Sequence, residues 1–256
     1  MATTDIMLNS AAFLPPERHN EAISLDGLRV IFQTLEESTI RLESKLTEIT
    51  YRRKPNPIGS NSFYEYQVSY GSIMSEIWII VDNIYRVSNF LKFIPEIATT
   101  DVGKAFNESL LMIKGLRDSL HHIDERITKY FEKEGASILG DIKWRSRVSV
   151  NDREESHYLI SGVRRLQDPI LDFAEVQPKI FLNRVGIYDL RIKYVERLKN
   201  KELPFEMNLE MVVHTVNDVI IFINRTYSRF LSDFLGKDFP EVIMPSIASV
   251  RIQLPD

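Results

Sequence analysis

Ten consecutive residues carry the densest group of chemically competent side chains in this chain. They read Arg117-Asp118-Ser119-Leu120-His121-His122-Ile123-Asp124-Glu125-Arg126. A histidine titrates near pH ~6.5 and can therefore give or take a proton close to neutrality. An arginine offers a charged fork to phosphate oxygens. Together such groups could supply a base, an acid and a cation for proton transfer beside a phosphate group.

A long helix is predicted to position these side chains. It begins at Asp101 after an N-cap at Thr99 or Thr100, and it ends near Glu134 before Gly135. Its apolar stripe comprises Phe106, Leu110, Ile113, Leu116, Leu120, Ile123, Ile127 and Phe131. At about 100° per residue, Asp118 and Glu125 point away from this stripe, His121 and His122 flank them, and Arg117 lies at the edge. The alternative interpretation is a solvated helix face with salt bridges between neighbouring turns.

Three further long helices are predicted from apolar side chains at alternating steps of three and four. They span residues 25–53, 63–93 and 207–235. The run 77–81 is too short to cross a bilayer, and we interpret it as a helix segment buried on both sides. The run 219–223 is apolar all round, which indicates burial on more than one side, as in a subunit interface.

The segment 138–201 has a different pattern. Strict alternation over 142–150 predicts a half-buried strand, with Trp144 on one face and Lys143, Arg145 and Arg147 on the other. These three cations are candidate RNA contacts, and the alternative is a solvated strand face. Return and third strands are predicted at 157–163 and 180–182, whereas 187–198 fits a helix at least as well as a strand.

The predicted fold class is therefore mainly α: an up-and-down bundle of four long helices with a small antiparallel β insertion. The predicted divisions are a mobile N-terminal arm (1–22), the bundle (23–137 and 202–256) and an α+β insertion with a β-hairpin (138–201).

Composition excludes several classes of function. The chain has no cysteine, which removes disulfides, thiolate nucleophiles and cysteine-based zinc sites. It also lacks P-loop, GxGxxG, GxSxG and HExxH motifs, so neither a cofactor nor a metal is expected. A net charge of −4 argues weakly against a general nucleic-acid binder, although 138–201 holds 13 Lys and Arg against 9 Asp and Glu. Without a signal peptide or membrane span, we expect a cytoplasmic protein.

The Arg117-Asp118-x-x-x-His122 pattern resembles the signature of the HEPN superfamily, in which an arginine and a polar residue precede a histidine by a few positions. The resemblance covers the four predicted helices but neither the 138–201 segment nor the N-terminal arm. It implies a helical bundle that commonly forms dimers, with two motifs across a two-fold axis. Many members are metal-independent endoribonucleases, often in toxin or anti-phage systems. Others bind RNA or nucleotides without cleaving them.

Carried over by position, the resemblance makes Arg117 and His122 the essential catalytic pair and Asp118 their supporting polar residue. His121 and Glu125 stand beside them as further support without a role in the motif. Three hypotheses remain open at this point. The first is a ribonuclease dimer, with an antitoxin as a possible protein partner, and the second is a HEPN-like module that binds RNA, a nucleotide or a protein without cleaving. The third is a helical scaffold in which the motif is incidental.

Overall fold

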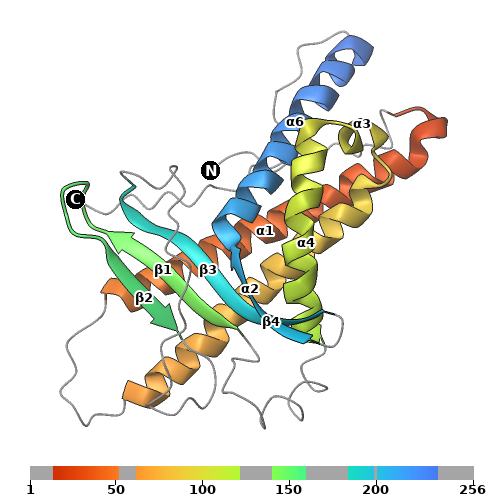
Figure 1. Cartoon of the computed structure of the whole chain (residues 1–256). Coiled ribbons are helices and arrows are strands. Elements are labelled where there is room, and N and C mark those ends of the chain that lie inside the picture. The colour runs from red at the N-terminus through yellow and green to blue at the C-terminus, as the bar shows by residue number, and fades with distance from the viewer. Residues whose placement is uncertain (1–13, 52–61, 122–139, 160–183, 199–200, 236–256) are drawn as a thin grey trace.

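A computed structural model of the chain describes residues 14–51, 62–121, 140–159, 184–198 and 201–235. Its helices are η2 (Pro16–Arg18), α1 (His19–Tyr51), α2 (Ser62–Leu91), α3 (Pro95–Ala98), α4 (Asp101–His121) and α6 (Leu209–Leu235). Its strands are β1 (Asp141–Arg147), β2 (Glu155–Leu159), β3 (Gly186–Leu198) and β4 (Lys201–Asn208). The protein is mainly helical with one small antiparallel sheet, as the sequence predicts (Figure 1).

The long helices contact one another in the order α1, α2, α4 and α6. α1 packs along α2, and α4 packs along α6, with α2 and α4 in contact where the pairs meet (Figure 1). Polar contacts support both pairings: Glu76 of α2 accepts from Lys45 of α1 at 2.7 Å, and the hydroxyls of Ser109 and Thr215 lie 3.1 Å apart between α4 and α6. An up-and-down order of the four helices stays a prediction.

The helix predictions are largely confirmed. The apolar stripe of the first helix is buried, and α4 begins at Asp101, where the Thr100 hydroxyl accepts from the Gly103 amide at 3.1 Å as an N-cap. α1 begins at His19, so residues 19–22 belong to a helix rather than to the predicted N-terminal arm. Residues 122–134 of the third predicted helix lie outside the described residues.

The sheet has the strand order β2-β1-β3-β4, with every neighbouring pair antiparallel. β2 is the predicted return strand, shifted to an earlier start, and the ambiguous segment 187–198 is a strand. β4 was not predicted. Because β4 pairs with β3, the sheet extends to Asn208, beyond the predicted end of the insertion at 201. The third strand predicted at 180–182 lies outside the described residues.

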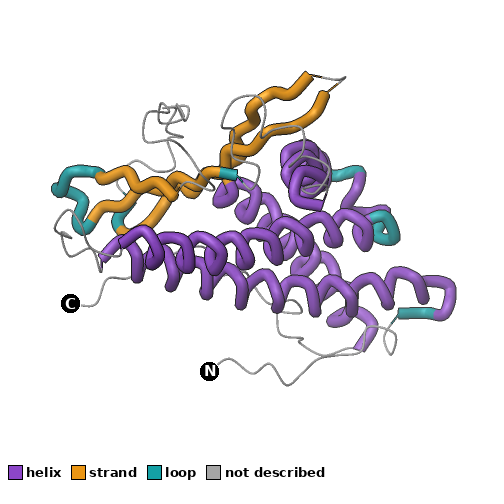
Figure 2. The backbone as a smooth tube through the Cα atoms, turned by 90° about the horizontal axis from the view of Figure 1, so that it is seen from below, coloured by secondary structure: helices purple, strands orange, loops and turns teal. Residues whose placement is uncertain are grey.

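Three aromatic side chains form hydrogen bonds between the sheet region and three different helices. The Trp144 indole donates to the Thr50 hydroxyl of α1 at 2.9 Å, and the Tyr194 hydroxyl donates to the Met112 carbonyl of α4 at 2.9 Å. The Tyr70 hydroxyl of α2 donates to the carbonyl before β1, that of Gly140, at 2.8 Å. The sheet lies along one side of α1 and α2 (Figure 2) and shares one apolar core with the helices.

The structure corrects the prediction that the basic face of β1 is open to a partner. Lys143 and Arg145 are buried, and Arg147 is partly buried. Arg145 forms ion pairs with Glu154 and, at 2.9 Å, with Asp189, while Arg147 lies 3.6 Å from Glu154. Alternation in the sequence separates two faces of a strand but does not say whether the second face is covered. Here acidic side chains compensate the positive charges of β1 within the fold. The proposed contact of these basic residues with RNA therefore has no support from their placement.

Candidate functional site

Two stripes of polar side chains face each other where α2 meets α4. Trp78, Asp82 and Arg86 follow one another at steps of four on α2, and Arg117 and His121 do so on α4. A step of four residues keeps side chains on one face of a helix. The two stripes line a surface hollow of about 410 Å³, which we call the α2–α4 groove; its walls are Trp78, Ile79, Val81, Asp82, Asn83, Arg86, Arg117, Leu120 and His121.

Asp82 is the centre of the polar contacts in this groove. Its Oδ1 accepts from Arg117 Nε at 3.1 Å, and its Oδ2 lies 2.8 Å from Arg86 Nη2. The Nε2 atom of His121 lies 3.8 Å from Oδ1. The Arg117 guanidinium also stacks over the Tyr85 ring, 4.4 Å from its centroid. Arg117 is thus held in place from two sides.

The electrostatic balance of the groove favours an anion. Partial burial by itself raises the pKa of the Asp82 carboxyl, but the hydrogen bond from Arg117 and the charges of Arg86, Arg117 and His121 outweigh it, and the pKa lies below its ordinary value. Among the lining residues two guanidiniums share this one carboxylate, and Asp118, which does not line the groove, lies 4.0 Å from the Arg117 guanidinium and offsets part of its charge. His121 is 56% exposed as a side chain and can therefore reach a bound molecule.

The structure brings two of the predicted site residues together and separates others. Arg117 and His121 share the groove. Asp118 is half exposed, 4.0 Å from the Arg117 guanidinium, and does not line the groove. His122 and Glu125 lie outside the described residues, so the pairing of Asp118 with His122 stays a prediction. The basic residues of β1 belong to the sheet network and not to the groove.

Sequence reasoning missed the α2 half of this site. The run 77–81 was interpreted as buried on both sides, yet Trp78 is 41% exposed, while Ile77 and Ile80 are fully buried. The regular spacing of Trp78, Asp82 and Arg86 opposite the apolar face of α2 was the available signal. That this stripe meets Arg117 depends on how α2 packs against α4, which a single sequence does not reveal.

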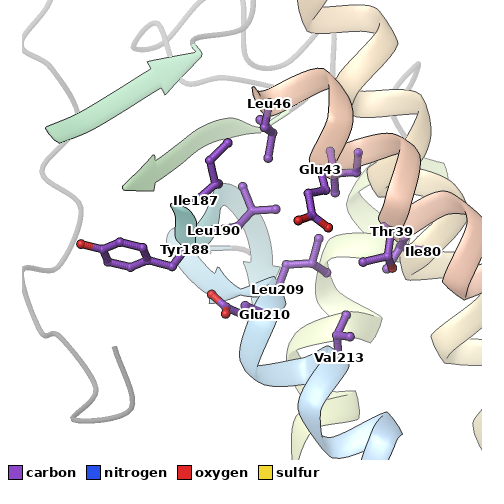
Figure 3. Close-up of a pocket in the computed structure, with 11 residues that line it drawn as sticks. Thr39, Glu43, Leu46, Ile80, Ile187, Tyr188, Leu190, Leu209, Glu210 and Val213 are labelled. Carbon is purple, nitrogen blue, oxygen red and sulfur yellow. The ribbon is translucent and has the colours of Figure 1, made fainter. Parts of the chain in front are cut away.

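A second, smaller cavity lies between the sheet and the helices. Its walls are almost entirely apolar, and its polar lining residues are Thr39, Glu43, Tyr188 and Glu210 (Figure 3). Burial raises the pKa of both carboxyls despite the nearby Arg184. Glu210 is already engaged, because it accepts from the Asp189 amide at 2.8 Å and pairs with Arg184. At about 40 Å³ the cavity has room for a few water molecules and not for a substrate.

Comparison with known proteins finds no matching family model, no matching curated protein and no matching solved structure. Within the described ranges, no helix has the length and apolar character that crossing a bilayer requires. Over the same residues, acidic and histidine side chains nowhere form a group of three or more that could hold a metal ion.

Proposed function

We propose that this protein is a HEPN-like, metal-independent endoribonuclease that acts as a homodimer, with RNA bound in the α2–α4 groove. The observation that carries the proposal is the convergence of Arg117 and His121 with Asp82 in one solvent-open hollow that Arg86 also lines. The resemblance of Arg117-Asp118-x-x-x-His122 to the family motif supports it independently of the geometry. The long helices α1, α2, α4 and α6 would supply the bundle of that family.

In the proposed reaction, the 2′-oxygen of a ribose attacks the adjacent phosphorus as a base removes its proton. The bond from phosphorus to the 5′-oxygen breaks, and an acid protonates the leaving oxygen. The products are a 2′,3′-cyclic phosphate and a 5′-hydroxyl. Arg117 binds the scissile phosphate, His122 transfers the proton, and Asp118 orients His122; His121 and Glu125 support them.

The alternative is a HEPN-like module that binds RNA, a nucleotide or a protein without cleaving it. One observation favours it: Arg117 is already paired with Asp82 and stacked on Tyr85, so it would have to exchange partners to reach a phosphate. A cellular role in a toxin or anti-phage system, with an antitoxin as partner, is part of the first proposal and rests on the resemblance alone.

The test is incubation of purified protein with RNA, with and without EDTA. We expect cleavage that survives EDTA and that His122→Ala slows by ~10²–10⁴, the usual share of a general acid or base. His121→Ala should slow it less, because His121 matches no motif position. His19→Ala is the matched control, since His19 is an exposed histidine at the start of α1. Binding without cleavage by the wild type would favour the alternative, and an active His122→Ala variant would overturn the assignment of the base.

A further inference from the structure

Trp78 is placed unlike the other tryptophan of the chain. The chain has two tryptophans, and Trp144 is 1% exposed and hydrogen-bonded inside the core. Trp78 is 41% exposed and lines the α2–α4 groove beside Asp82 and Arg86. Isolated exposed apolar residues are common on protein surfaces. An indole in a hollow that also holds two guanidiniums has instead the composition of a site for a flat, anionic ligand.

The neighbours of Trp78 determine which flat ligand fits. Asp82 and Arg86 follow it by one and two helical turns, and Arg117 and His121 approach from α4. The Arg86 side chain is itself largely exposed, so it can bind a phosphate next to the groove. An aromatic platform beside cationic side chains is how proteins bind unpaired nucleotides: a base stacks on the ring and the backbone phosphates bind the cations.

We propose that Trp78 is a base-stacking subsite and that the substrate of the groove is unpaired, single-stranded RNA. This inference rests on the proposed function and adds a substrate class to it. Inside a duplex both faces of each base are covered by neighbouring bases, so an internal base has no free face for the indole. An unpaired base stacks on Trp78 and leaves its phosphates to Arg86 and Arg117. Every base has a π-face, so the subsite distinguishes single strands from duplexes but does not distinguish one base from another.

Binding and cleavage are separated by the choice of probe. The probe is a 2′-O-methyl RNA strand, which lacks the attacking hydroxyl, offered either as a single strand or as a duplex. Intrinsic tryptophan fluorescence reports on the site, because buried Trp144 supplies a constant background. The variants are Trp78→Leu and Trp78→Phe. Phe93→Leu is the matched control, since Phe93 is an exposed aromatic residue that does not line the groove.

We expect the single strand to quench the emission of the wild type and the duplex not to do so. Trp78→Leu should weaken single-strand binding by roughly 5- to 150-fold, the range of one base–aromatic stack, and Trp78→Phe should retain most of the affinity. Because these variants lack the reporting indole, their affinities are measured by the fluorescence anisotropy of a labelled strand, with the wild type measured in the same way. Phe93→Leu should bind like the wild type. Because Trp144 is buried in the folded protein, an unshifted wavelength of its emission maximum in the Trp78 variants verifies that they are folded.

Several results would overturn the subsite. They are equal binding of single strand and duplex, wild-type affinity in Trp78→Leu, or no binding of the single strand at all. A dimer that becomes a monomer in Trp78→Leu would assign the indole to a protein contact instead. A different result would overturn the ribonuclease proposal alone. If the wild type binds the methylated strand but leaves ordinary RNA intact, the base-stacking subsite stands and the proposed catalysis does not. Cleavage of ordinary RNA at the wild-type rate by Trp78→Leu removes the subsite alone.

Discussion

Asp82 is the residue on which the chemistry of the groove depends most. It is the shared counterion of Arg86 and Arg117, and an RNA phosphate would have to compete with it for both guanidiniums. Asp82→Asn keeps the side-chain shape and removes the negative charge. We therefore expect this variant to bind a single-stranded, 2′-O-methyl RNA several-fold more tightly than the wild type, measured by fluorescence anisotropy at fixed salt.

The control for this variant is Glu37→Gln, which removes one exposed carboxylate elsewhere, on α1. If the two variants gain affinity equally, the effect comes from net charge and not from the groove. If Asp82→Asn binds RNA more weakly, Asp82 acts by positioning Arg117 rather than by competing with phosphate.

The lowered pKa of Asp82 also predicts how stability depends on pH. A carboxyl whose pKa is lower in the folded than in the unfolded chain contributes stability above the ordinary pKa of 3.8, and this contribution is lost as the pH falls toward the folded value. Asp82→Asn should therefore be less stable than the wild type at pH 6, and the difference should shrink below about pH 4. Urea denaturation at pH 6 and pH 3 measures it. An unchanged difference would mean that the ion pairs of Asp82 add nothing to stability.

At the scale of elements, an irregularity in β3 explains why that strand was hard to predict. The register between β1 and β3 shifts between Lys143 and Arg145, which leaves Asp189 and Leu190 together opposite Trp144. Asp189 has a φ of 55°, in the left-handed region that aspartate tolerates better than most residues. The extra residue breaks the alternation of apolar side chains that identifies a strand. β4 was not predicted because Pro204 lies within it, and a proline argues against a central strand. The structure accommodates this proline because β4 is an edge strand.

The same irregularity buries a network of charges around Asp189. Its Oδ1 accepts from Arg191 Nε at 2.6 Å and from Asn208 Nδ2 at 2.8 Å, while its Oδ2 lies 2.9 Å from Arg145 Nε without hydrogen-bond alignment. Burial, and the charges of Arg145 and Arg191, lower the pKa of the neighbouring Lys143. The basic residues of β1 thus have a structural explanation that a single sequence could not supply, since their acidic partners come from the loop before β2 and from β3.

Removal of Asp189 should destabilise the protein strongly. Asp189→Ala would remove the carboxylate that two buried guanidiniums share, leaving Arg145 with Glu154 alone and Arg191 with Glu206 alone, a loss of up to about 3–5 kcal/mol. Asp189→Asn should lose less, because asparagine tolerates positive φ and its carbonyl can still accept from Arg191 or Asn208. Asp152→Ala, at an exposed turn position, should change the free energy of unfolding by less than about 0.5 kcal/mol. Urea denaturation of the three variants measures this order, and equal losses in the Ala and Asn variants of Asp189 would contradict it.

At the scale of the whole molecule, the helical periods located the four long helices and most of the core, because the apolar stripes alone define which face is buried. The order in which the helices pack is a long-range property. This packing places Arg117 against α2 and forms the groove, and a single sequence does not reveal it. Arg117 and His121 were therefore predictable as candidates from the polar face of the third predicted helix, and the residues on α2 were not.

The exposed side of α6 provides a test of the proposed dimer. In the predicted interface run 219–223, Val219, Ile220 and Ile223 are buried within the monomer, whereas Ile221 is 45% exposed. We expect the wild type to be a dimer at micromolar concentration by light scattering, and Ile221→Glu to be a folded monomer. Val30→Glu, at an exposed position of α1, should remain a dimer. A monomeric wild type would count strongly against a site composed of two copies.

Cleavage of an oligonucleotide that carries one ribonucleotide within an otherwise 2′-deoxy strand tests the central claim most directly. The proposed chemistry needs a 2′-hydroxyl as nucleophile and no metal. We therefore predict, in EDTA, a single cut on the 3′ side of the lone ribose, a 2′,3′-cyclic phosphate on one product, and loss of the cut in Arg117→Ala. An intact strand, cuts at deoxy positions, or products that end in a 5′-phosphate would contradict the account.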